Sequence, residues 1–206
     1  QRWRAARENR STFIQFVTWN DYTENTQLAP AYDTRYAVLD LNRYFIDWWK
    51  QGRAPDVVRD RVYLFLKKYP PDAPMFPFQS VQPPAAGCVE VCTLLTAPAT
   101  VRVPGRAEPY QAPAGLHWRQ LPLAPGPVSA EVVRDGQVVL ALTHPERVTD
   151  RPYRPQDSTS AVSSEFLRHW RADFGPAEPV LHSEYGDADK DGLPNWFEMY
   201  WFGTFL

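Results

Sequence analysis

The spacing of apolar positions in the first third of the chain predicts one strand followed by two helices. Residues 12–18 form a short run rich in β-branched and aromatic side chains, which is typical of a buried strand. Apolar side chains then recur around a broad helical face over 34–50 and again over 55–68, so we predict a helix for each range. Residues 1–10 are basic and lack proline and glycine, which indicates the end of a further helix.

The middle of the chain carries shorter apolar runs that are rich in Val and Leu and separated by Pro and Gly. Within 87–148 these runs cover residues 88–96, 99–103, 108–112, 115–121, 127–134 and 137–143. The turn Arg134-Asp135-Gly136-Gln137 has Asp-Gly at its centre, which is a strong signal for a hairpin. Several short strands at this spacing predict a small antiparallel β-sandwich. No catalytic constellation lies inside it, so we expect an accessory or structural module.

These patterns give an α+β fold class and divide the chain into four parts. The parts are a βα segment at 1–69, a proline-rich linker at 70–86, the sandwich at 87–148, and a helix of about 164–173 with an acidic loop within 149–206. One parallel strand has no partner inside 1–69, and a (β/α)8 barrel takes about 250 residues. We therefore expect this segment to be either the last βα unit of such a barrel, whose other units lie outside these residues, or a helical cap on the sandwich.

Charge and composition exclude several classes of partner. The net charge of −2 gives no reason to expect nucleic acid or an anionic membrane surface. The sequence has no apolar run long enough to span a bilayer, and no signal peptide opens it. In a strand, Cys88 and Cys92 would lie about 13 Å apart, which is too far for a mutual disulfide, so we expect free thiols. No Cys/His cluster indicates a zinc site, and the oligomeric state is not set by these patterns.

Candidate chemistry is concentrated first in residues 16–30, directly after the predicted strand. Two carboxylates, Asp21 and Glu24, stand three positions apart in this stretch. Glycosidic cleavage needs one carboxyl group to protonate the leaving oxygen and a second to activate water or stabilise the charged centre. Loops that follow the strands of a parallel sheet are where α/β enzymes place such groups. The aromatic and amide side chains that flank the pair are Trp19, Asn20 and Tyr22.

A second motif, D-A-D-K-D-G-L-P-N-W-F-E at residues 187–198, has the spacing of an EF-hand calcium loop. Alternate residues of such a loop point inward, so that hard oxygen atoms surround one hard cation. The predicted Ca²⁺ ligands are Asp187, Asp189, Asp191, the Leu193 carbonyl, Asn195 and Glu198. We expect one structural calcium site that ties the aromatic segment after it to the rest of the chain. The alternative is a solvated acidic turn before a helix.

Both motifs resemble sequences of known families. The stretch T-W-N-D-Y-T-E-N-T-Q-L-A-P-A is similar to the last-strand motif of two related groups of glycoside hydrolase barrels, the alpha-1,3-glucanases (mutanases) and the endo-alpha-mannosidase-like enzymes. It departs from both at Thr23-Glu24-Asn25. The resemblance implies that Glu24 is the catalytic acid and Asp21 the base, and that a sugar subsite is shaped by Trp19, Asn20 and Tyr22. The acidic loop resembles the dockerin and thrombospondin type 3 calcium repeats of secreted bacterial proteins.

We therefore expect the C-terminal portion of an extracellular or periplasmic polysaccharide hydrolase that acts on alpha-glucan or alpha-mannan and holds structural Ca²⁺. By itself the 206-residue chain should be inactive, because a barrel active site draws residues from several strands. The alternative is a non-catalytic carbohydrate-binding or structural module stabilised by calcium, in which Asp21 and Glu24 are ordinary loop carboxylates and Trp19 is a core residue. The four histidines are scattered and no nucleophile elbow is present, which argues against a serine hydrolase.

Overall fold

The computed structural model describes the chain over residues 2–9, 11–21, 26–31, 33–70, 73, 87–151 and 159–176. The helices are α1 (Arg2–Glu8), α2 (Ala37–Gln51) and α3 (Phe166–Phe174). The strands are β1 (Arg61–Leu66), β2 (Cys88–Leu95), β3 (Ala99–Val103), β4 (Ala107–Ala112), β5 (Gly115–Pro122), β6 (Ser129–Arg134), β7 (Gln137–Thr143) and β8 (Ser160–Ser163). No helix in this described part is long and apolar enough to cross a membrane.

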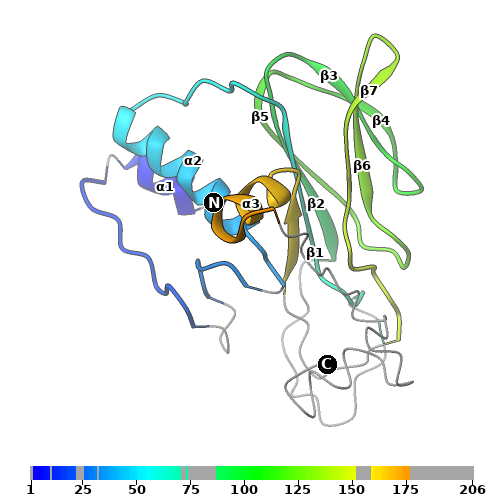
Figure 1. The fold of residues 1–206 in the computed structure, drawn as a ribbon, viewed down its shortest axis with the longest axis horizontal. Coiled ribbons are helices and arrows are strands. Elements are labelled where there is room, and N and C mark those ends of the chain that lie inside the picture. The colour runs from blue at the N-terminus through cyan, green and yellow to red at the C-terminus, as the bar shows by residue number, and fades with distance from the viewer. Residues whose placement is uncertain are drawn as a thin grey trace.

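The elements form three layers, with helices on one face of a sheet and a second sheet on its other face (Figure 1). The first sheet has the strand order β5-β2-β1-β8 and the second has the order β4-β3-β6-β7. All paired neighbours are antiparallel. The described residues therefore form an α+β fold, and they contain neither a parallel strand pair nor the predicted barrel unit.

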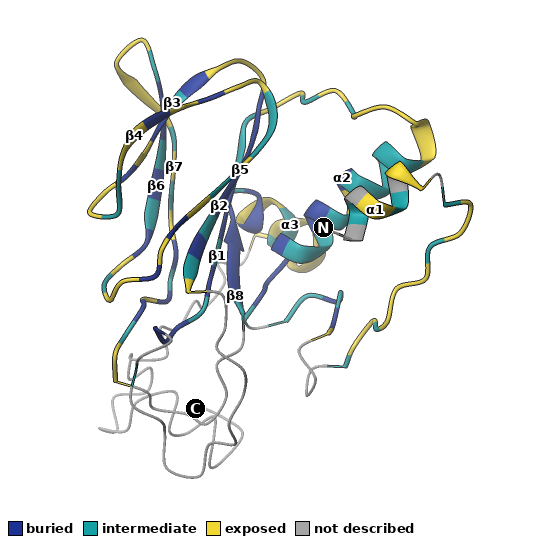
Figure 2. Cartoon of the chain, turned by 180° about the vertical axis from the view of Figure 1, so that it is seen from behind, coloured by how far each residue is buried: buried dark blue, intermediate teal, exposed yellow. Residues whose placement is uncertain are grey.

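Strand β1 lies between the helices and the second sheet, and it is therefore buried on both faces (Figure 2). Val62, Leu64 and Leu66 point into the core between the two sheets. Tyr63 points the other way and packs in a second core against α2, together with Leu41 of that helix. Side chains alternate between the faces of a strand, so the first sheet joins the two cores.

The helix predicted over 55–68 is wrong, because residues 61–66 form the β1 strand and the rest of this range has no regular structure. A strand that is buried on both faces reads as a continuous apolar run, and periodicity does not separate such a run from a buried helix. The strands that pair with β1 are β2 and β8, and β8 lies far along the chain. Local sequence therefore carried no signal of the pairing.

The strand predicted over 12–18 is also wrong. Residues 12–17 make no backbone hydrogen bond with any described residue, and Phe13 and Val17 are 75% and 66% exposed. A strand needs a neighbour to satisfy its backbone groups, and none of the eight described strands lies beside this segment. Residues 12–17 form an irregular segment with bends at Thr12 and Val17.

Several of the other predicted elements are confirmed. Helix α2 ends at Gly52, whose φ of +70° places it in the left-handed region that favours glycine. Six of the strands match the apolar runs of the predicted sandwich, and α3 matches the predicted helix near residue 164. Asp135 and Gly136 have φ values of +50° and +77°, as a tight hairpin between β6 and β7 requires. Cys88 and Cys92 are both free thiols.

Candidate active site

The residues on either side of the predicted catalytic motif lie face to face. The Thr18 N–H donates to the Thr26 carbonyl at 3.3 Å, and the Leu28 N–H donates to the Thr18 carbonyl at 3.1 Å. The Ala29 N–H donates to the Trp19 carbonyl at 2.8 Å. Residues 18–21 and 26–29 are thus held together at the base of a closed loop. Inside this base, the Asp21 N–H donates to Thr18 Oγ1 at 3.0 Å, which fixes the backbone that carries the Asp21 carboxylate.

The segment that leads into this loop is attached to the helices by its aromatic neighbours. Trp49 of α2 donates its indole N–H to the Ser11 carbonyl at 2.8 Å. The rings of Trp3 and Phe16 lie 5.5 Å apart, and Trp3 Nε1 donates to Asn42 Oδ1 of α2 at 2.8 Å. Helices α1 and α2 therefore set the position of the loop, although the segment makes no strand.

A pocket of about 520 Å³ lies between this segment and α2. Phe16, Trp19 and Leu28 form one wall, and Leu39 and Ile46 of α2 form the other. The polar lining is contributed by Asp40, Asn42, Arg43, His169 and Tyr36. Its volume lies within the ordinary range for small-ligand sites, and the loop that carries Asp21 begins at its rim with Trp19.

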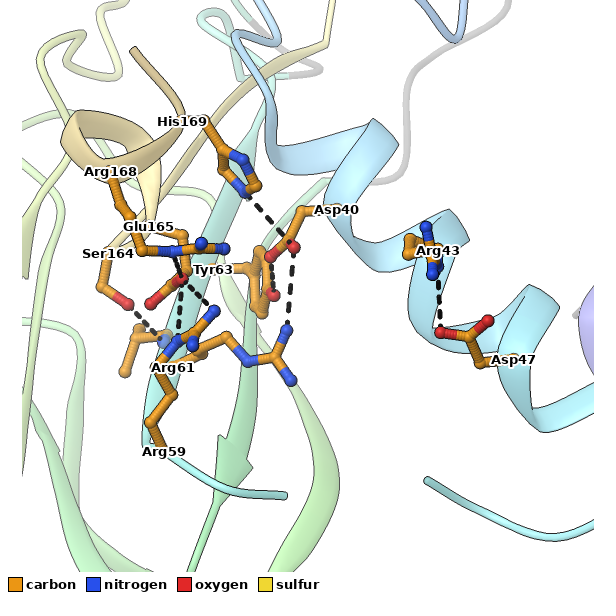
Figure 3. Close-up of polar contacts among 11 residues, drawn as sticks. Asp40, Arg43, Asp47, Arg59, Arg61, Tyr63, Ser164, Glu165, Arg168 and His169 are labelled. Carbon is orange, nitrogen blue, oxygen red and sulfur yellow. Dashed lines mark hydrogen bonds and ion pairs between the residues drawn. The ribbon is translucent and has the colours of Figure 1, made fainter. Parts of the chain in front are cut away.

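Asp40 is a buried carboxylate in the lining of this pocket, and three elements meet at it (Figure 3). The Tyr63 hydroxyl of β1 donates to Asp40 Oδ2. Arg61 Nη1 and His169 Nε2 lie 3.6 Å and 3.4 Å from Oδ1. Burial, and then the charge of Asp40, raise the pKa of Tyr63 well above its usual range, so the phenol remains a donor. Through these three partners Asp40 joins α2 to β1 and α3, and it holds these elements in place around the pocket.

Helix α3 is fixed on the sheet by a second set of polar contacts, centred on Glu165 (Figure 3). Arg59 Nε and Arg168 Nε both donate to Glu165 Oε2, at 2.9 Å and 2.5 Å. Burial by itself would raise the pKa of Glu165, but these hydrogen bonds outweigh it and the pKa is lowered. The charged carboxylate therefore holds the start of α3, and this places His169 beside the pocket.

Comparison with known proteins decides the family. The model of glycosyl hydrolase family 71 matches residues 1–160, which is more than three quarters of the chain. The chain belongs to glycosyl hydrolase family 71. No curated protein and no solved structure matches it. The predicted resemblance to a glycoside hydrolase is confirmed at this level.

The matched range of the family-71 model contains both the predicted catalytic motif and seven of the strands. The family-71 region thus includes most of the sandwich, and of its described strands only β8 extends beyond that region. Helix α3 and the predicted calcium loop lie beyond residue 160.

Three of the predicted site residues of this family-71 protein are described by the structure. Trp19 lines the pocket and is 58% exposed, Asn20 is exposed beside it, and Asp21 is half-buried at the base of the loop. Glu24 and Tyr22 lie outside the described residues, as do all six predicted calcium ligands. Across the described part of the chain, no group of three or more His, Cys, Asp or Glu residues has the arrangement of a metal site.

Sequence reasoning missed Asp40, Tyr63 and His169. Tyr63 was assigned to a helix, which hid its position opposite α2. Asp40 carried a usable signal, because it lies four residues from both Tyr36 and Tyr44 and so shares their buried helical stripe. An acidic residue on the buried stripe of a helix needs partners from another element.

Proposed function

We propose that this family-71 protein is a glycoside hydrolase that cleaves alpha-glucan, with Asp21 and Glu24 as its catalytic pair. The observation that carries the proposal is the family-71 match over the segment that contains Asp21 and Glu24, in which Trp19 lines a pocket and residues 18–21 are hydrogen-bonded to residues 26–29. The resemblance of this motif to alpha-1,3-glucanases favours alpha-glucan over alpha-mannan as the substrate.

In the proposed mechanism, Glu24 protonates the oxygen of the leaving sugar and Asp21 activates water or stabilises the charged centre. The described residues support the role of Asp21 by fixing its backbone: Thr18 accepts its N–H, and the paired threonines Thr18 and Thr26 lie within 3.2 Å of each other through their hydroxyl oxygens. Trp19 offers an exposed ring for the apolar face of a sugar, and Asn20 offers an amide for its hydroxyl groups.

Hydrolysis of insoluble alpha-1,3-glucan by the complete natural gene product tests this proposal. We expect wild-type protein to release reducing ends, and Asp21→Asn and Glu24→Gln each to reduce the rate by at least about a hundredfold, as removal of a general acid or base does. Asp56→Asn is the matched control, because Asp56 is a carboxylate that pairs with Arg53 at the surface, and neither residue lines the pocket. Wild-type activity in Asp21→Asn would contradict the proposal. Binding of glucan without hydrolysis by the wild type would favour the non-catalytic alternative.

We also propose that the loop at 187–198 holds one structural Ca²⁺ and that the protein acts outside the cell. The calcium proposal is supported by the ligand spacing of the loop, from Asp187 to Glu198. An extracellular location suits a polymeric substrate, which is too large to cross a membrane. Addition of millimolar Ca²⁺ should raise the melting temperature of the wild type, and Asp187→Ala should abolish the rise. Equal melting temperatures of the wild type with Ca²⁺ and with a chelator would exclude the site.

A further inference from the structure

We infer that the helix-side face of the first sheet carries a second carbohydrate-binding site, formed by Trp118 and Phe65, that holds a neutral glucan chain away from the catalytic loop. The inference rests on the proposed function, because it takes alpha-glucan as the polymer. It deepens that function by giving the sandwich a role in recognition of the substrate.

The site is centred on an aromatic platform. Trp118 lies on β5, the outer strand of the first sheet (Figure 1), and is 40% exposed. Its ring lies 5.6 Å from that of Phe65 on β1, at an interplanar angle of 24°. Strand β2 lies between these two strands, and its Cys92 is the partner in register of Trp118. The two rings therefore stack on each other over β2, and the stack reaches solvent at Trp118, whose outer side is open to a ligand.

The alternation of side chains along β5 separates this platform from the core of the sandwich. His117 and Arg119 turn to the opposite face, where both contact Tyr110: the rings of His117 and Tyr110 lie 5.9 Å apart, and Arg119 Cζ lies 4.1 Å from the centre of the Tyr110 ring. Trp118 is thus not needed to fill the space between the sheets. On its own face α2 covers Tyr63, which is fully buried, whereas Trp118 stays exposed.

Polar groups lie on the same face, one step along the strands. Gln120 follows Trp118 by two residues, so the two side chains share a face of β5. Gln120 Nε2 donates to Glu90 Oε1 of β2 at 2.7 Å. Glu90 is also the partner in register of Phe65. The rings therefore lie beside an amide and a carboxylate that are already oriented by each other.

This combination suits a sugar ring better than it suits a protein partner. A pyranose presents a face of C–H groups that packs on an aromatic ring and a rim of hydroxyl groups that hydrogen-bond to amides and carboxylates. A stable protein interface needs about 800 Å² of surface on each partner, which is far more than one half-exposed tryptophan and its neighbour supply. The carboxylate of Glu90 disfavours an acidic polysaccharide, so the geometry points to a neutral one. A chain held at this platform and at the catalytic loop would bind more tightly through its two attachments.

Binding at this site is measured by the amount of the 206-residue protein that insoluble alpha-1,3-glucan removes from solution. We expect Trp118→Ala to weaken binding by roughly tenfold, as loss of an aromatic stacking contact does, and Trp118→Phe to retain most of the affinity. Phe174→Ala is the matched control, because Phe174 is an exposed aromatic residue on α3, 59% exposed, and does not belong to the platform. A melting curve for each variant shows whether its fold is intact. Gln120→Ala leaves the two rings in place and should weaken binding severalfold.

The outcomes also separate this site from the proposed catalytic function. Trp118→Ala in the complete gene product should slow hydrolysis of the insoluble polymer but not of short soluble oligosaccharides. If Trp118→Ala binds the glucan as the wild type does, or if the wild type binds a polyuronate as well as it binds the glucan, the inference is overturned. If the wild type binds the glucan but hydrolyses nothing, the catalytic proposal fails and this site remains.

Discussion

Arg134 and Asp60 join the two sheets at one end of the sandwich through a bidentate ion pair. Arg134 is the last residue of β6 in the second sheet, and Asp60 directly precedes β1 in the first. Arg134 Nη2 donates to Asp60 Oδ1 at 2.9 Å, and Nη1 donates to Oδ2. Asp60 Oδ1 also accepts the backbone N–H and the hydroxyl of Thr96, at 2.8 Å and 2.9 Å. The carboxylate therefore holds both the second sheet and the residue that follows β2.

The first prediction concerns the acid stability that this pair provides. The hydrogen bond from Arg134 is the largest cause that lowers the pKa of Asp60 from 3.8 to about 2. A lowered pKa in the folded state stabilises the protein above the unfolded pKa, and the stabilisation is lost as the pH falls through about 2. We expect Asp60→Asn to lower the free energy of unfolding at pH 5 by about 1 kcal/mol, after allowance for solvent screening, and the difference to shrink toward pH 2. Urea unfolding at both pH values measures it.

Asp56→Asn is the control for this experiment. Asp56 pairs with Arg53 at the surface, with 84% of its side chain exposed, and such pairs contribute little. A difference in unfolding free energy between wild type and Asp60→Asn that is the same at pH 5 and pH 2 would show that the effect does not arise from the ionised carboxylate.

The second prediction concerns the hydroxyl of Tyr63, which donates to the buried Asp40. Tyr63→Phe removes this donor and leaves a buried carboxylate with one hydrogen bond fewer, so we expect the free energy of unfolding to fall by about 1–3 kcal/mol. Tyr110→Phe is the matched control: its hydroxyl is buried and has no hydrogen-bond partner within the described residues. That change should be neutral or slightly stabilising. Equal losses in the two variants would contradict the role of Asp40.

The third prediction concerns the β6–β7 hairpin. Gly136 has a φ of +77°, and a Cβ added there would meet no atom within 4 Å. Any cost of Gly136→Ala therefore comes from the backbone, and we expect about 1 kcal/mol of destabilisation in chemical unfolding. Gly136→Asn should cost less, because asparagine tolerates the left-handed region better than alanine. Equal losses of unfolding free energy in Gly136→Ala and Gly136→Asn would contradict this explanation.

The fourth prediction concerns the two thiols. Burial raises the pKa of Cys92 well above its usual value, and burial also raises the pKa of the half-buried Cys88. A thiol reagent at pH 8 should modify Cys88 slowly and Cys92 only after unfolding, since the thiolate is the reactive form. When the protein is denatured without a reductant, two thiols per chain should react with the reagent. Rapid modification of both in the native state, or fewer than two thiols after denaturation, would contradict the structure.

The sandwich could be predicted from the sequence wherever a strand carries its own signals. Runs of Val and Leu between Pro and Gly, and the Asp135-Gly136 turn, gave six strands of the two sheets. β1 was missed because V-Y-L-F-L is apolar at every position, and β8 because S-A-V-S is too short for a period to be read. Both are defined by a pairing between residues separated widely along the chain, which no local pattern records.

The catalytic and substrate-binding roles of the motif residues stay predictions, and the structure tests only where three of them lie. Trp19, Asn20 and Asp21 stand together in a recognisable motif, and the structure describes them at the base of one loop. The residues beneath that loop come from three elements, as Asp40, Tyr63 and His169 show. Their meeting depends on the packing of α2 and α3 on β1, which the wrong assignment of β1 concealed.

The position of β1 has a consequence for how a protein of this kind can evolve. The segment that carries the catalytic motif also supplies the strand between β2 and β8. A genetic exchange that joined residues 87–151 to another catalytic segment would leave a gap at the centre of the first sheet, with the backbone groups of two strands unpaired. Strand β1 must therefore be inherited together with the sandwich, so an exchange that replaces the motif loop has to fall before Arg61 in the chain.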